Sequence, residues 1–116
     1  MALIIYRGGT KKFSVVLYDK NSVELDCATM ENIEVILTHK VTKQEYAKYS
    51  MTAQAGWITV SVVDGRLVVP INATITETMD LGALEVMVTV YQTDTDFTNS
   101  ESIVKAKTVL AYVKDV

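Results

Sequence analysis

The sequence predicts an all-β fold, and two observations carry the prediction. Asp64-Gly65 separates the apolar runs 58–63 and 67–71, and Asp-Gly is a strong hairpin signal because both residues tolerate the positive φ values of a two-residue turn. Residues 83–92 then alternate between apolar and other side chains, with Leu84, Val86, Val88 and Val90 on one face. This period of two is typical of a half-buried antiparallel strand.

Eight segments show strand character, and their spacing of 8–12 residues predicts an antiparallel β-sandwich or a barrel; the sandwich is the fold class we expect. We expect strands at 2–6, 12–18, 32–40, 45–51, 57–63, 66–71, 83–92 and 102–113. The polar stretch 41–44 is expected to close a hairpin between the third and fourth strands. The stretch 72–81 is the one helical candidate, because Asn72 or Thr74 can cap a turn and Ile75 and Met79 have helical spacing.

Size and charge narrow the possible partners. The chain has 116 residues and a net charge of −3, which predicts a single domain over 1–116 with one core. Basic residues are mixed with acidic ones, so nucleic-acid binding lacks its electrostatic signature. The apolar segments are shorter than the ~18 residues of a membrane span, and we expect no membrane partner. A mean hydropathy of +0.21 indicates that part of the surface is covered by another protein.

Residues that could perform chemistry are sparse. Cys27 is the one cysteine and lies among apolar residues, so we expect a small buried side chain. His39 is the one histidine and is expected at an outward or edge position. The carboxylates within 94–101 lack the glycine and late glutamate of a calcium loop and are interpreted as a solvated turn. The sequence thus predicts no enzyme, no catalytic, cofactor-binding or metal-binding residues, no cofactor and no small-molecule substrate.

Aromatic residues and the two terminal strands are the candidate interaction surface. The segments 2–6 and 109–113 are apolar on both faces, and an exposed apolar strand edge pairs readily with another chain. Trp57 begins a strand and is interpreted as a core residue or an interface anchor, since Trp and Tyr dominate interface energetics. Tyr46 and Tyr49 lie three apart in one strand, so one of them should point outward. The predicted assembly interface comprises Leu3, Ile5, Tyr49, Trp57, Val109, Ala111 and Val113.

Several segments in order resemble the N-terminal immunoglobulin-like domain of phage baseplate upper proteins. These are Phe13-Ser-Val-Val-Leu-Tyr-Asp19, Val23-Glu-Leu-Asp-Cys-Ala-Thr29, Leu67-Val-Val-Pro-Ile71, Thr76-Glu-Thr-Met-Asp-Leu-Gly82, the strand 83–93 and the closing strand 103–113. The resemblance covers most of the chain, and it consists of turns and alternation. It implies an immunoglobulin-like sandwich and a structural role in a virion, and it carries over no catalytic residue.

Two functions follow as expectations. The first is a structural component of a bacteriophage virion, in the baseplate, tail, neck or capsid surface, assembled in the bacterial cytoplasm. Its partners are other virion proteins and further copies of the chain. The alternative is a stand-alone carbohydrate- or receptor-binding module in which Trp57, Tyr46 or Tyr49 stacks on a ligand.

Overall fold

The computed structural model describes residues 3–18, 21–93 and 102–115, with the backbone alone for 92–93 and 102–110. Its elements, in chain order, are β1 (Leu3–Tyr6), β2 (Lys11–Val15), β3 (Leu17–Tyr18), β4 (Glu24–Leu25), η1 (Cys27–Thr29), β5 (Asn32–His39), β6 (Glu45–Ser50), β7 (Ile58–Thr59), β8 (Val62–Val63), β9 (Arg66–Ile71), α1 (Ala73–Thr76), β10 (Gly82–Thr93) and β11 (Ser102–Lys114). The all-β prediction is confirmed, and each of the eight expected segments contains at least one strand. Within the described residues, no helix is long and apolar enough to cross a membrane.

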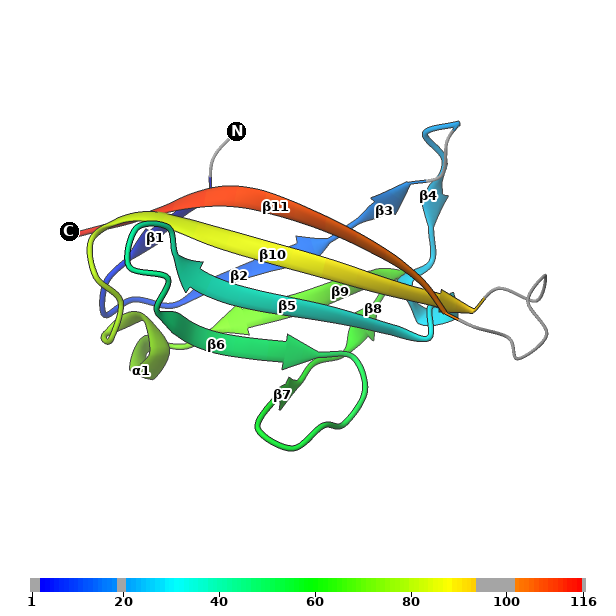
Figure 1. Cartoon of the computed structure of the whole chain (residues 1–116), viewed down its shortest axis with the longest axis horizontal. Coiled ribbons are helices and arrows are strands. Elements are labelled where there is room, and N and C mark those ends of the chain that lie inside the picture. Colours follow the sequence, from blue (N-terminus) through cyan, green and yellow to red (C-terminus); the bar gives the residue numbers. More distant parts are fainter. Residues whose placement is uncertain (1–2, 19–20, 94–101, 116) are drawn as a thin grey trace.

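The strands form two facing sheets and a small hairpin (Figure 1). The larger sheet has the order β1-β11-β10-β5-β6-β7, the smaller has the order β2-β9-β8, and β3 pairs with β4. In the described residues only β1–β11 and β6–β7 are parallel pairs. The other pairs are antiparallel. Four of them, β3–β4, β5–β6, β8–β9 and β10–β11, join successive strands, for which a short connection requires this arrangement.

The chain crosses from one sheet to the other at both edges. On one side β1 belongs to the larger sheet and β2, only a few residues later, belongs to the smaller. On the other side, Val60 N–H donates to Ser50 O of β6, while Ser61 O accepts from Val68 N–H of β9. The chain therefore connects the two sheets on both sides, while the edge strands β1, β7, β2 and β8 each pair with one neighbour only.

Two segments that were expected to form one strand each form two strands instead. The segment 57–63 is split into β7 and β8, and the segment 12–18 is split into β2 and β3, with the members of each pair in different sheets. The elements β4 and η1 are absent from the prediction, since two or three residues carry too little periodicity to be detected.

Two turns predicted from the sequence are present in the structure. Asp64 and Gly65 have φ values of 52° and 78° and join β8 to β9, so the predicted hairpin is confirmed. The predicted helical turn is α1, where Asn72 Oδ1 accepts from Ile75 N–H at 3.0 Å. His39 organises the hairpin between β5 and β6, and its position corrects the sequence expectation: it is 7% exposed and points inward.

The inward position of His39 follows from the alternation of β5, in which Leu37 and His39 share a face. Its Nδ1 accepts from the N–H groups of Val41 and Thr42 at 3.1 and 3.2 Å, and its Nε2 lies 3.4 Å from Leu81 O. Because backbone N–H groups only donate, Nδ1 is the unprotonated nitrogen. The imidazole thus ties the β5–β6 loop to the start of β10.

The core lies between the sheets and consists of aliphatic side chains from both. Its fully buried members include Ile33, Val35, Leu37 and Leu84 from the larger sheet and Leu67, Val69 and Ile71 from the smaller. Met79, after α1, is also buried. The single cysteine, Cys27, is buried as expected, and its Sγ lies 3.5 Å from Val15 O. Burial raises the pKa of the Cys27 thiol, which keeps it in the unreactive protonated form.

A buried hydroxyl fixes α1 to the crossing between β1 and β2. Thr76 is fully buried; its Oγ1 donates to Gly9 O at 2.6 Å and accepts from Gly8 N–H at 3.1 Å. Replacement by valine keeps the shape but leaves both backbone groups without this partner. We expect Thr76→Val to lower the free energy of unfolding by about 1–2 kcal/mol, measured by urea denaturation.

The matched control is Thr78→Val. Thr78 is exposed, and its hydroxyl bonds only to Ile75 O in the preceding turn, so a change within about 0.5 kcal/mol is expected. Equal unfolding midpoints for the two variants would show that the Thr76 hydroxyl does not hold α1 in place.

Candidate functional site

The outer face of the larger sheet carries both candidate features of the surface. On β10, Leu84, Val86 and Val90 are buried, so the odd-numbered residues point outward. The registers Ile4↔Tyr112 and Tyr112↔Ala83 continue this outward row across β11 to β1. The face therefore extends over five neighbouring strands, from β1 to β6.

One feature is a band of exposed apolar side chains, which we call the outer band. Its members are Ile4, Tyr6, Met87 and Tyr112, which are 37%, 50%, 40% and 40% exposed. Half-buried Ile36 of β5 lies opposite Met87 in the register. Scattered apolar residues are normal on a protein surface, but several on adjacent strands of one face are typical of an interaction site.

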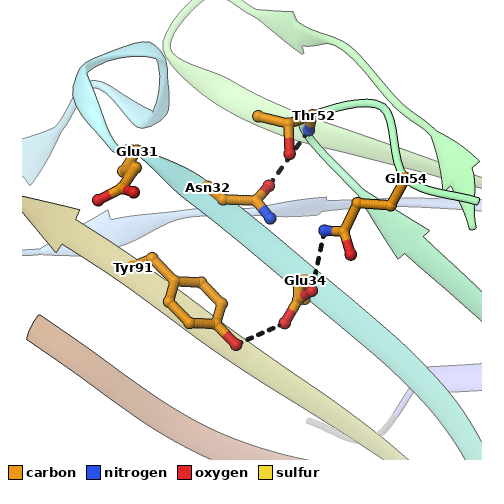
Figure 2. A pocket seen from close by; sticks show the side chains of 6 residues that line it. All are labelled: Glu31, Asn32, Glu34, Thr52, Gln54 and Tyr91. Carbon is orange, nitrogen blue, oxygen red and sulfur yellow. Dashed lines mark hydrogen bonds between the residues drawn. The ribbon is translucent and has the colours of Figure 1, made fainter. Parts of the chain in front are cut away.

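The second feature is a polar pocket on the same face. Its cavity has a volume of about 340 Å³. The residues that line it are Glu31, Asn32, Glu34, Thr52, Gln54 and Tyr91. They come from the start of β5, the end of β10 and the loop after β6. Figure 2 shows the side chains of Asn32, Glu34, Gln54 and Tyr91 converging on a common space.

Asn32 holds the loop after β6 in position. Its Oδ1 accepts from Ile33 N–H at 2.9 Å, from Ser50 Oγ at 3.1 Å and from Thr52 N–H at 3.2 Å. Although Asn32 lies on the outward side of β5, this loop covers it, and only 9% of the residue is exposed. The amide thereby fixes the chain that carries Gln54 into the pocket.

Glu34 is held by two donors, one on each carboxylate oxygen. Tyr91 Oη donates to Oε1 at 2.7 Å, and Gln54 Nε2 donates to Oε2 at 3.0 Å and to Ser50 Oγ at 3.0 Å. The hydrogen bond to the carboxylate, followed by desolvation, raises the pKa of Tyr91. The phenol therefore stays protonated and keeps the Glu34 carboxylate oriented.

The residues predicted for the assembly interface lie mostly in the core. Ile5, Tyr49 and Ala111 are fully buried, and Val113 is 3% exposed. Leu3 is half-buried and packs on the core, while Val109 belongs to β11 but its side chain lies outside the described residues. Buried side chains present no surface to a partner. The correction amounts to one residue in register, since the exposed positions on β1 and β11 are Ile4, Tyr6 and Tyr112.

The aromatic residues proposed to stack on a ligand are engaged elsewhere. Tyr46 is half-buried and its hydroxyl accepts from Asp80 N–H at 3.0 Å. Tyr49 points into the core, which corrects its assignment to a ligand or interface. Trp57 is half-buried rather than in the core, and Lys48 Nζ lies 4.9 Å from the centre of its ring. An ammonium over an indole face is a favourable cation–π contact.

Two carboxylates outside the pocket have structural roles. Glu24 pairs with Arg66 at 2.8 Å, and Asp26 Oδ1 accepts from Ala28 N–H to cap η1. The carboxylate cluster at 94–101 lies outside the described residues. Among the residues that are described, no group of three or more His, Cys, Asp or Glu side chains is placed to hold a metal ion.

Comparison of the chain with protein-family models, with curated proteins and with solved structures finds no match. The polar pocket was missed by the sequence analysis because its residues are spread over 31–34, 52–54 and 91. The alternation of β10 was the one available signal, since it places Tyr91 outward.

The hydroxyl of Tyr49 is buried without a hydrogen-bond partner among the described residues. Burial raises the pKa of Tyr49 to about 12. We expect Tyr49→Phe to be neutral or to raise the free energy of unfolding by about 1 kcal/mol at pH 7, because an unpaired buried hydroxyl is costly. Urea denaturation of the wild type and the variant measures the difference.

The same variant should also resist alkali better. The folded pKa lies above that of the unfolded chain, near 10, so the folded state holds the extra proton and loses stability as the pH rises from about 10 to about 12. Tyr49→Phe removes this loss. A variant that is less stable than wild type by more than about 1 kcal/mol at pH 7 would show that the hydroxyl has a partner.

Proposed function

We propose that the chain is an immunoglobulin-like sandwich that acts as a structural component of a bacteriophage virion through protein–protein contacts. The strand order supports the fold assignment. A sheet containing β11-β10-β5-β6 faces a sheet of β2-β9-β8, as the strands G, F, C and C′ face B, E and D in variable-type immunoglobulin domains. The β3–β4 hairpin and the parallel β7 depart from that pattern.

The outer band is the observation that carries the assembly proposal. A well-packed interface needs aromatic and apolar anchors on a stable surface, and the band supplies two tyrosines, an isoleucine and a methionine on β1, β10 and β11. These strands are joined by continuous ladders, so the surface is preformed. Covering it stabilises a complex by roughly 25 cal/mol for each Å² of apolar area removed from water, before the costs of association.

The virion and its assembly in the bacterial cytoplasm come from the resemblance to the baseplate upper protein domain. The segments that carry this resemblance include β9, the turn around α1 and β10, which follow one another along the chain. In the proposal the outer band contacts a second copy of the chain or another virion protein. Buried residues such as Ile5 and Ala111, on the inner face of the same strands, hold these strands in place.

Association is tested with a substitution in the outer band. We expect wild-type protein to self-associate as its concentration rises, as measured by sedimentation velocity. Tyr112→Lys should weaken this association by about 10–30-fold, the size expected for an interface anchor worth about 2 kcal/mol.

The control is Tyr18→Lys, because Tyr18 is 60% exposed on β3, away from the larger sheet, and should leave association unchanged. Wild-type protein that remains monomeric, or two variants with equal effects, would contradict self-assembly through the outer band.

Incorporation into particles tests the virion role directly. We expect mass spectrometry of purified virions, produced by the phage that encodes the chain, to detect it in a fixed ratio to the other structural proteins. Tyr112→Lys should lower that ratio, while Tyr18→Lys should not. Absence of the wild-type chain from intact particles would refute the proposal.

A further inference from the structure

The polar pocket retains two hydrogen-bonding atoms that the fold does not use. Backbone N–H groups of Ile33 and Thr52 donate to Asn32, so its oxygen must face them and its Nδ2 faces the other way. A carboxylate only accepts, so the Gln54 atom bonded to Glu34 must be Nε2. Gln54 Oε1 therefore also remains available. The pocket presents a donor from Asn32 and an acceptor from Gln54, two of the side chains that line it in Figure 2.

The donor of Asn32 is open to the pocket. Asn32 as a residue is only 9% exposed, but its Nδ2 is not among the fully buried polar atoms of the described residues that lack a partner, so it can bond to water when no ligand is present. In the described residues its amide nitrogen has no hydrogen-bond acceptor. A ligand that accepts from this nitrogen is thus favoured over one that cannot.

Charge and hydrogen bonding together restrict the ligand chemistry. The pocket is lined by two carboxylates, Glu31 and Glu34, and by no cationic side chain, so an anion is repelled. An ammonium or guanidinium group has no acceptor for Asn32. A hydroxyl group accepts from Asn32 and donates to Gln54 or Glu34, so it satisfies both requirements at once.

We propose that this pocket binds a neutral polyhydroxylated ligand, namely a sugar unit of a glycan. The several hydroxyls of a sugar ring can both accept from Asn32 and donate to Gln54, and the ring of Tyr91 lines the pocket to contact an apolar sugar face. The volume of about 340 Å³ is at the lower end of ligand sites, which suits one sugar ring. The inference retains the carbohydrate-binding alternative but assigns it to residues other than Trp57, Tyr46 and Tyr49.

The pocket is also preorganised for such a ligand. Asn32 is fixed by three donors, and Glu34 is fixed by Tyr91 and Gln54. Because these side chains are already ordered, binding loses little of their rotational freedom. Hydrogen bonds to a sugar are weak because they compete with hydrogen bonds to water, so a small entropy cost of binding is important for affinity.

The test is an NMR titration of the ¹⁵N-labelled full chain with methyl glycosides of neutral hexoses and N-acetylhexosamines. At least one glycoside should shift the side-chain NH₂ signals of Asn32 and Gln54 in a saturable way. Gln54→Met removes the free acceptor and the Glu34 contact, and Asn32→Asp keeps the oxygen acceptor but removes the donor. Each should weaken binding at least tenfold.

Glu85→Gln is the matched control, because Glu85 lies on the outward side of β10, as Tyr91 does, but outside both the pocket lining and the outer band. The affinity of this variant for the glycoside should stay within twofold of wild type. If Asn32→Asp fails to fold, the Gln54→Met result decides. The proposal is overturned if no glycoside shifts these signals, if arginine amide shifts them instead, or if both pocket variants bind normally. None of these outcomes bears on self-association, which is measured separately.

Discussion

The alternation of β10 is the constraint on which the rest of the structure depends. This strand pairs with β11 along its whole length and with β5 along most of it. Its pleat therefore determines which side chains of both neighbouring strands point into the core. Even-numbered residues such as Leu84 and Val86 enter the core, and odd-numbered residues such as Met87 and Tyr91 face out. A slip of one residue would exchange the two sets, removing the core, the outer band and the polar pocket together.

The crossings at both sheet edges explain how a small domain protects this arrangement. An open sheet exposes unpaired backbone groups that recruit other strands. Here the chain passes from β1 to β2 and from β7 to β8, and Thr76 bonds the first crossing to α1. The crossings hold the two sheets together at these points, although the edge strands still pair with a neighbour on one side only.

The two surface features have different physical characters and suit different ligands. The outer band is apolar, gains free energy by excluding water, and accommodates many partners of complementary shape. The polar pocket gains its selectivity from fixed hydrogen-bonding atoms, because a ligand that fails to match them leaves groups such as Asn32 Nδ2 unsatisfied. A surface with both features on one sheet face can join a neighbouring subunit and still leave a separate position for a small ligand.

The sequence by itself determined the local structure: the hairpin on Asp64-Gly65, the turn capped by Asn72, and the strands with clear alternation. These features depend on backbone preferences and on burial with a period of two, and both are determined by residues close together in the sequence. Tertiary structure alone decided which face of β1 and β11 is buried, because segments that are apolar on both faces carry no alternation to distinguish Ile4 from Ile5. It also decided the polar pocket, because its atoms come from three distant segments that only the register of β5, β6 and β10 brings together.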